Sequence, residues 1–284
     1  MEGVYVANVT PFREDATFSL DVEAYVGHVA WLAERGMRGV VPFGTNGEGT
    51  SVSVEEKLGA LGRLFSEGLE VEVIPTVAEG NLPDTLRMLE GLEGLPATAV
   101  LALPPYYIKP VSDEGLRKFY EAAIEVTRHP VIVYHIPKYA VPVPAEVVMD
   151  LPVWGVKDSG GEEGYAEALL RNGRGVLIGT EDDLWERLGL GAEGIISALA
   201  NFIPEQMVEM HRLAKKGDEH NGRELSKRLQ EVRAATKAYA APGVLKRLAG
   251  ARHGIDLGTV RPPLMPPPPE YDPERVLRLA SVAS

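Results

Sequence analysis

The sequence predicts a (β/α)₈ barrel of the TIM type, an α/β fold, followed by a C-terminal helical extension. Eight short apolar runs alternate along the chain with longer segments of helical periodicity. The apolar runs are continuous stretches rich in Val, Ile and Leu, as expected for parallel strands covered on both faces. The alternative is an open doubly wound sheet, but the turn after residue 10 lacks the Gly-x-Gly-x-x-Gly pattern usual in that fold.

The first four β/α units are marked by apolar runs and by helix-start signals. Their strands are expected at residues 4–10, 39–43, 70–76 and 97–103. The first helix is predicted over residues 21–35, because one face carries Val22, Tyr25, Val26, Val29 and Leu32. The second helix begins after Ser53, which forms a capping box with Glu56. Helices over residues 82–92 and 113–128 complete this half.

The next four units repeat the alternation. Their strands are expected at residues 131–134, 154–157, 176–179 and 194–197. Their helices are expected at residues 144–151, 162–171, 181–190 and 204–216. Eight units of this kind are the number that closes a barrel.

The chain continues beyond the eighth unit with helical patterns and a proline-rich strap. The helices are predicted over residues 218–238, 242–251 and 273–282, and the strap over 261–269. We therefore expect residues 1–217 to form the barrel. Residues 218–284 are expected to be a helical extension packed on it, so that the two make a single structural unit.

Composition narrows the classes of function. The net charge of -12 argues against a nucleic-acid partner, because phosphate binding needs clustered Lys and Arg. The absence of Cys excludes disulfides and thiolate chemistry. The N-terminal residues lack the basic and apolar segments of a signal peptide, and no apolar run is long enough to span a membrane. We expect a cytoplasmic protein with no nucleic-acid or membrane partner.

A single lysine, Lys157, ends the apolar run that starts at residue 153. A lysine amine in water has a pKa of about 10.4 and is not nucleophilic at neutral pH, whereas partial burial can turn it into a Schiff-base former. Alternatively, Lys157 directs its charge out of the strand end into solvent. The other strand ends decide between the two interpretations.

Several other predicted strand ends carry polar residues. The turn Gly44-Thr45-Asn46-Gly47-Glu48-Gly49 follows the second strand, and its backbone N–H groups can approach a carboxylate, although an ordinary βα turn is equally consistent with it. Tyr134 ends the fifth strand and is either a core residue or an acid/base group. Thr180 and Asp182 follow the seventh strand and are as consistent with a helix cap.

These residues together suit imine chemistry on a 2-oxo acid. The amine of Lys157 would attack the ketone, and the resulting iminium would withdraw electrons from the adjacent C–C bond. The phenol of Tyr134 would transfer the protons. A turn containing Thr45 would hold the carboxylate.

Five motifs, in order and at the expected strand ends, resemble the dihydrodipicolinate synthase / N-acetylneuraminate lyase family of class I aldolases. The motifs are Gly44-Thr45-Asn46-Gly47-Glu48, Pro105-Tyr106-Tyr107, Tyr134-His135-Ile136-Pro137, Gly155-Val156-Lys157-Asp158 and Gly194-Ile195-Ile196-Ser197. The resemblance covers residues 3 to 265. It implies a metal-independent lyase without a cofactor, usually a homotetramer built as a dimer of dimers.

The resemblance also implies roles for residues. Lys157 is similar to the Schiff-base lysine and Tyr134 to the general acid/base. Thr45 and Asn46 stand where the family binds the pyruvate carboxylate, although the family usually has Thr-Thr or Ser-Thr there. Tyr107 stands where a tyrosine enters a neighbouring subunit's site and completes a proton relay through Thr45 to Tyr134. A sixth position, Ile196, falls at a backbone site that lines the pyruvate pocket.

One departure bears on the substrate. Dihydrodipicolinate synthases carry an arginine, two residues after the proline of the Tyr motif, that pairs with the aldehyde's carboxylate; here that position is Tyr139, preceded by Lys138. A tyrosine cannot make that bidentate pair. The motifs are closer to 4-hydroxy-2-oxoglutarate and 2-keto-3-deoxygluconate aldolases, so we expect cleavage or formation of a C–C bond in a small 4-hydroxy-2-oxo acid.

Three other functions stay open at this point. The first is another imine-forming activity, either dihydrodipicolinate synthase or, as a further possibility, a dehydratase acting on a sugar acid. The second is a non-catalytic barrel that binds a 2-oxo acid. The third is a metal-dependent aldolase, which we do not favour because the six histidines show no close His-x-His or His-x-x-x-His spacing.

Overall fold

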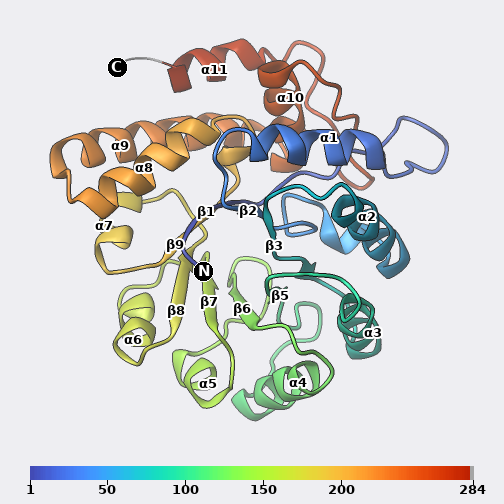
Figure 1. The fold of residues 1–284 in the computed structure, drawn as a ribbon, viewed down its shortest axis with the longest axis vertical. Coiled ribbons are helices and arrows are strands. Elements are labelled where there is room, and N and C mark those ends of the chain that lie inside the picture. The colour runs from blue at the N-terminus through green and yellow to red at the C-terminus, as the bar shows by residue number, and fades with distance from the viewer. Residues whose placement is uncertain (282–284) are drawn as a thin grey trace.

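The computed structural model describes residues 1–281, and its strands form a parallel ring surrounded by helices (Figure 1). The strand segments are β1 (Gly3–Val6), β2 (Gly39–Val40), β3 (Glu72–Val73), β4 (Thr76–Val77), β5 (Val100–Ala102), β6 (Val131–His135), β7 (Gly155–Asp158), β8 (Gly175–Ile178) and β9 (Gly194–Ser197). The order around the sheet is β3-β2-β1-β9-β8-β7-β6-β5-β4. Because β3 and β4 are consecutive in sequence, the ring closes between them.

The closing strand is interrupted at Pro75. The chain from residue 72 to 77 donates to β2 on one side, where Ile74 N bonds Val40 O at 3.0 Å. On the other side it accepts from β5, where Leu101 N bonds Pro75 O at 2.9 Å. Since proline has no N–H to donate, the strand predicted over 70–76 appears as two short segments, β3 and β4. The described residues therefore form eight barrel strands, as predicted.

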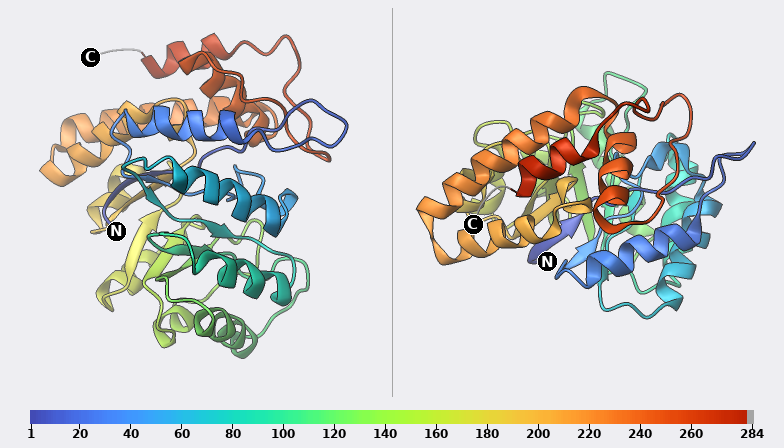
Figure 2. Two further views of the ribbon diagram at one scale, coloured as in Figure 1. Left: turned by 45° about the vertical axis from the view of Figure 1, so that its right-hand side comes forward. Right: turned by 90° about the horizontal axis from the view of Figure 1, so that it is seen from above.

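Helices cover the outside of the ring (Figure 2). The barrel helices are α1 (Val22–Ala33), α2 (Val54–Ser66), α3 (Leu82–Leu92), α4 (Asp113–Glu125), α5 (Ala145–Asp150), α6 (Tyr165–Arg171), α7 (Leu184–Gly189) and α8 (Pro204–Lys216). The capping box predicted at Ser53 and Glu56 is present at the start of α2. One apolar cluster fills the space between strands and helices, and a second, which includes Tyr134 and Ile196, fills the barrel interior.

The first two predicted strands extend too far at their carboxyl ends. β1 ends at Val6 and β2 at Val40, whereas the apolar runs continue to residues 10 and 43. Ala7 and Val41 still donate to Ser197 O and Val6 O, and the residues after them form buried irregular backbone at the mouth of the barrel. Apolar periodicity cannot distinguish a buried strand from a buried turn, so the boundary was not visible in the sequence.

The extension lies on one side of the barrel. It consists of α9 (Glu219–Ala235), the 3₁₀ turn η3 (Thr236–Ala238), α10 (Ala241–His253) and α11 (Pro273–Ser281). α9 runs beside α8, and α10 and α11 lie above them (Figures 1 and 2). The last helix was predicted to end at residue 282, which lies outside the described residues. None of the helices within residues 1–281 combines the length and apolarity needed to cross a membrane.

A buried histidine joins the extension to the barrel. His28 of α1 bonds Asn201 Oδ1 through Nε2 at 3.0 Å, and its Nδ1 meets His253 Nε2 of α10 at 3.1 Å. Asn201 in turn donates to the carbonyl groups of Ala7 and Ala198 at the barrel mouth. Burial lowers the pKa of His28 to about 4. The hydrogen bond with Asn201 raises this pKa, whereas the nearby His253 lowers it.

We expect the free energy of unfolding to fall by about 2 kcal/mol between pH 7 and pH 5 because of His28 alone. The unfolded chain binds a proton at the ordinary histidine pKa, whereas the folded chain resists it down to about pH 4. The stability is therefore complete above pH 6.5 and is lost as the pH falls toward 4. Urea denaturation of the wild type and of His28→Gln at both pH values measures the effect. An equal decrease in the two proteins would contradict the assignment.

Candidate active site

A cavity of about 430 Å³ opens at the carboxyl ends of the barrel strands. Its lining comes from the ends of β6, β7 and β9, from the turns after β1, β2, β6, β7, β8 and β9, and from α9, η3 and α10 of the extension. Of the residues predicted for a site, Thr45, Asn46, Tyr134, Tyr139, Lys157 and Ile196 line this cavity. The structure therefore brings six of the seven together.

Lys157 and Tyr134 are neighbours on adjacent strands. They are paired in the register between β6 and β7, and their side chains point into the barrel with only 3% exposure each. Lys157 Nζ lies 4.2 Å from the centroid of the Tyr134 ring. Gly179 on β8's following turn makes room for this lysine, because a Cβ there would lie 3.0 Å from Lys157 Cε and 2.1 Å from Ser159 Oγ.

The phenol of Tyr134 reaches across the barrel to the turn after β2. Its hydroxyl lies 3.2 Å from Thr45 Oγ1. Within residues 1–281, the backbone N–H groups of Thr45 and Asn46 donate to no protein acceptor. An anion bound at this turn would therefore receive backbone donors close to the hydroxyl groups of Thr45 and Tyr134.

The turn after β2 is held in an unusual backbone conformation. Phe43 and Glu48 have φ of 59° and 53°, in the left-handed region. Gly49 is required beside them, because a Cβ there would lie 1.7 Å from Phe43 O. Left-handed side chains persist only where their surroundings fix them. Here the fixing contacts come from Glu48.

Glu48 is anchored by the extension. Its carboxylate accepts from Lys246 Nζ of α10 at 2.6 Å and from the backbone N–H of Arg261 at 2.9 Å. Lys246 also donates to the carbonyl of Thr259 at 2.5 Å. Burial lowers the pKa of the Lys246 amine to about 8, while the Glu48 charge opposes the shift. A buried pair of this kind needs both partners, because either charge alone would be left unpaired in the interior.

Tyr107 is the predicted site residue that does not join the others. It lies on the turn after β5, its side chain is 88% exposed, and it is absent from the cavity lining. The neighbouring Ile108 is also exposed. The role predicted for Tyr107, entry into another subunit's site, stays a prediction.

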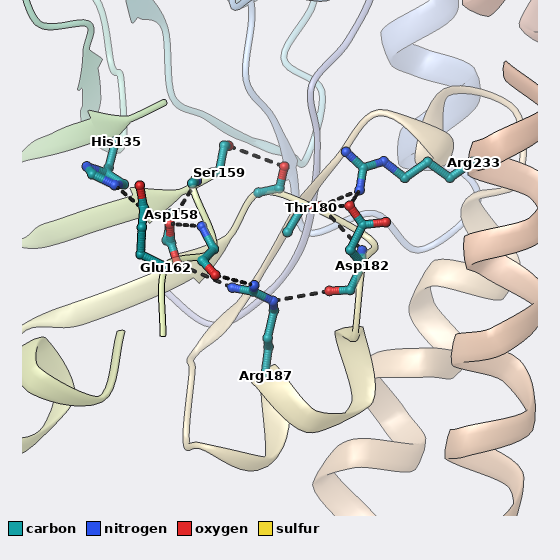
Figure 3. A network of polar contacts seen from close by, with 11 residues as sticks. His135, Asp158, Ser159, Glu162, Thr180, Asp182, Arg187 and Arg233 are labelled. Carbon is teal, nitrogen blue, oxygen red and sulfur yellow. Dashed lines mark hydrogen bonds and ion pairs between the residues drawn. The ribbon is translucent and has the colours of Figure 1, made fainter. Parts of the chain in front are cut away.

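Behind Lys157, a polar network fixes the end of β7 (Figure 3). The buried Asp158 accepts from the backbone N–H groups of Gly160 and Gly161 at 3.0 and 3.1 Å and pairs with Arg187 at 3.5 Å. His135 of β6 bonds Glu162 at 3.0 Å through Nε2 and accepts from the backbone N–H of Val143 through Nδ1.

This network contains the candidate metal-binding group of the described residues, namely His135, Asp158 and Glu162. Both ring nitrogens of His135 have protein partners, and both oxygens of Asp158 accept hydrogen bonds or an ion pair. The three side chains thus satisfy one another and their surroundings. We interpret them as a support that holds the backbone of Lys157 in place.

Arg233 is a cavity residue that sequence reasoning did not find. It projects from α9 toward the turn after β8 (Figure 3), where it donates to Thr180 Oγ1, pairs with Asp182 and lies 3.4 Å from Glu181 Oε2. Glu181 also accepts from the hydroxyl of Ser197 at 2.7 Å. Thr180 and Asp182 contact Arg233 and do not cap α7, whose N-cap Asp183 makes no side-chain capping hydrogen bond. No local sequence signal marks Arg233, because its partners lie about 50 residues away.

A sequence model of the dihydrodipicolinate synthetase family matches residues 1–280 of this chain. A 4-hydroxy-tetrahydrodipicolinate synthase from Methanospirillum hungatei is 30% identical over 293 residues, which cover 100% of this chain and 98% of that protein. The similarity therefore extends through the barrel and the extension.

Solved structures show the same arrangement. A dihydrodipicolinate synthase superposes with a TM-score of 0.87 at 26% identity, covering 99% of this chain and 98% of the other. A variant of the 2-keto-3-deoxygluconate aldolase from Sulfolobus solfataricus superposes with a TM-score of 0.89 at 25% identity, covering 98% and 94%. The chain is thus similar throughout to proteins of two named activities.

Proposed function

Because the chain belongs to the dihydrodipicolinate synthetase family, we propose that it is a Schiff-base (class I) aldolase or lyase. Its substrate is a small 4-hydroxy-2-oxo acid, and pyruvate or a related 2-oxo acid is the imine-bound component. The observation that carries this proposal is the contact of Lys157 with Tyr134, whose hydroxyl lies 3.2 Å from Thr45. Nucleophile, proton carrier and anion site are then within one cavity.

The reaction follows from these positions. The amine of Lys157, in its unprotonated form, attacks C2 of the oxo acid to give a carbinolamine. The carbinolamine hydroxyl takes the proton of the Tyr134 phenol and leaves as water, which gives an iminium ion and the Tyr134 phenolate. The phenolate of Tyr134 removes the proton of the C4 hydroxyl, and the C3–C4 bonding electrons move into the iminium. The aldehyde leaves, the enamine takes a proton at C3, and hydrolysis releases pyruvate and Lys157. The turn at Thr45 and Asn46 binds the carboxylate throughout.

Borohydride trapping tests this proposal. Incubation with pyruvate and borohydride should add one reduced pyruvyl group to the chain, and peptide mapping should place it on Lys157. Absence of an adduct, or an adduct on another lysine, would refute the imine mechanism. Incubation with acetate in place of pyruvate is the control, because acetate has no ketone.

A second candidate is 4-hydroxy-tetrahydrodipicolinate synthase, which is favoured by the full-length relative of that name. Against it, Tyr139 stands where such synthases use an arginine, and its side chain is half exposed at the cavity mouth. Condensation of pyruvate with aspartate semialdehyde at a higher kcat/KM than aldol cleavage would favour this candidate.

We further propose a cytoplasmic homotetramer, built as a dimer of dimers, with no nucleic-acid or membrane partner. The exposed Tyr107 and Ile108 support an interface at the turn after β5, since large apolar side chains at a surface often mark contacts between subunits. The proposed role of Tyr107 is to enter the neighbouring site. Analytical ultracentrifugation of the wild type and of Tyr107→Ala tests both points.

Exhaustive chelation is expected to leave activity unchanged. The iminium of Lys157 performs the electron withdrawal for which other aldolases use a metal ion. Aldol cleavage should be measured before and after dialysis against EDTA, with added Zn²⁺ as the control. A loss of activity that Zn²⁺ restores would show that the cluster of His135, Asp158 and Glu162 binds a functional ion.

A further inference from the structure

The charge of the cavity is opposite to that of the chain. The protein carries a net charge of -12, yet its cavity is lined by Lys138, Lys157, Arg233, Lys237 and a single carboxylate, Glu181. Charged side chains gathered in a concave site concentrate ligands of the opposite sign. A substrate with one carboxylate, bound at the turn after β2, leaves most of this positive charge unmatched.

Three of these cations lie away from that turn. Arg233 and Lys237 come from α9 and η3 of the extension, and Arg233 contacts the turn after β8. Two strands, β1 and β9, separate β8 from β2 in the ring. Lys138 follows β6, where its Nζ lies 4.9 Å from the centroid of the exposed Tyr139 ring. A substrate that reaches from Thr45 past Lys157 would present its aldehyde half to this group.

Glu181 offsets the charge of Arg233 but not that of Lys138 or Lys237. Its carboxylate accepts from Ser197 at 2.7 Å and lies 3.4 Å from Arg233, so it is already paired within the protein. Asp182 pairs with Arg233 from outside the cavity lining. Arg233 is thus fixed in place by its neighbours, while Lys138 and Lys237 are exposed lysines whose charge has no carboxylate partner among the described residues.

We propose that Lys138, Arg233 and Lys237 form a cationic rim that selects 4-hydroxy-2-oxo acids carrying a second anionic group on the aldehyde half. The proposal rests on the proposed function and names its substrate class. The second group is a carboxylate or a phosphate, since both are bound by the same donors. The rim takes the place of the missing arginine at Tyr139, and it comes mostly from the extension.

Two matched pairs of substrates test the proposal. 4-Hydroxy-2-oxoglutarate and 4,5-dihydroxy-2-oxopentanoate differ only in that the first has a terminal carboxylate where the second has a hydroxymethyl group. Cleavage of either substrate is measured as the release of pyruvate. Glyceraldehyde 3-phosphate and glyceraldehyde, each condensed with pyruvate, differ only by phosphate. We expect kcat/KM to favour the anionic member of at least one pair by about tenfold or more at low salt. The pair that shows the preference identifies the second anionic group of the substrate as a carboxylate or as a phosphate.

Variants assign the preference to the rim. Lys138→Gln/Lys237→Gln should reduce the preference about tenfold, mainly through KM, and added salt should reduce it in the wild type. Arg233→Gln should reduce it further, and Arg233→Lys should restore part of it. Lys227→Gln, an exposed position on α9 outside the cavity lining, is the matched control and should keep it.

Equal kcat/KM within both pairs, or a preference that the rim variants do not change, would overturn the proposal. Borohydride trapping distinguishes failure of the rim proposal from failure of the proposed function. If pyruvate still forms an adduct on Lys157, only the rim is refuted. If no adduct forms, the imine mechanism itself is refuted.

Discussion

Replacement of Lys157 with methionine is expected to abolish the pyruvate adduct and to lower kcat by a factor on the order of 10³ or more. Methionine is similar in length to lysine and fits the space beside Gly179, but it has no amine to form the iminium. Without that electron sink the C3–C4 bond has no pathway for cleavage. Among residues 1–281, Lys157 is the lysine whose amine lies over the ring of Tyr134.

This substitution should leave the fold intact, because it replaces a buried side chain with an apolar one of similar volume. Thermal denaturation and circular dichroism check this point. Lys227→Met is the control and should keep both the adduct and the turnover. An unchanged kcat in Lys157→Met would show that another residue forms the imine.

Tyr134→Phe is expected to lower kcat about 10²-fold with little change in KM, as is usual for a lost acid/base group. The phenyl ring still packs against Lys157, so the substitution removes only the hydroxyl that meets Thr45. The adduct with pyruvate should still form, although more slowly. Steady-state cleavage and single-turnover trapping separate the two effects.

Tyr271→Phe is the matched control for this variant. Its hydroxyl is buried without a hydrogen-bond partner among the described residues, and it lies outside the cavity lining. Its turnover should equal that of the wild type. Wild-type turnover in Tyr134→Phe itself would remove Tyr134 from the mechanism and leave Thr45 or a bound water as the proton carrier.

Local signals in the sequence predicted the barrel and the centre of the site. The capping box of Ser53 and Glu56 lies within four residues, and the strand ends at Tyr134 and Lys157 follow directly from the apolar runs. Pro75 was also visible, and it accounts for the division of the third barrel strand. Such features depend on neighbours in sequence, which is why they can be read without a structure.

The surroundings of the site depend on contacts between distant segments. Arg233 meets Thr180 across 53 positions, and Lys246 meets Glu48 across 198. The sequence around Arg233 or Lys246 does not indicate its partner, because a charged residue on a helix is ordinarily exposed to solvent. The cationic rim and the anchoring of the turn after β2 therefore required the three-dimensional arrangement.

We propose that the barrel of residues 1–217 and the extension of residues 218–284 act as a single structural unit. The buried pair of Glu48 and Lys246, the Arg261 N–H bond to Glu48 and the contact of His28 with His253 all join the two parts. Separation would leave Glu48 and Lys246 as unpaired buried charges. The extension is thus a necessary support of the barrel.

The pairing of Glu48 with Lys246 and Arg261 also orders events during synthesis on the ribosome. The turn that binds the carboxylate is made early, but the two residues that fix it are separated from it by about 200 positions. Until both residues have been synthesised, the turn lacks these contacts. The contacts that fix this turn are therefore complete only when translation has passed residue 261.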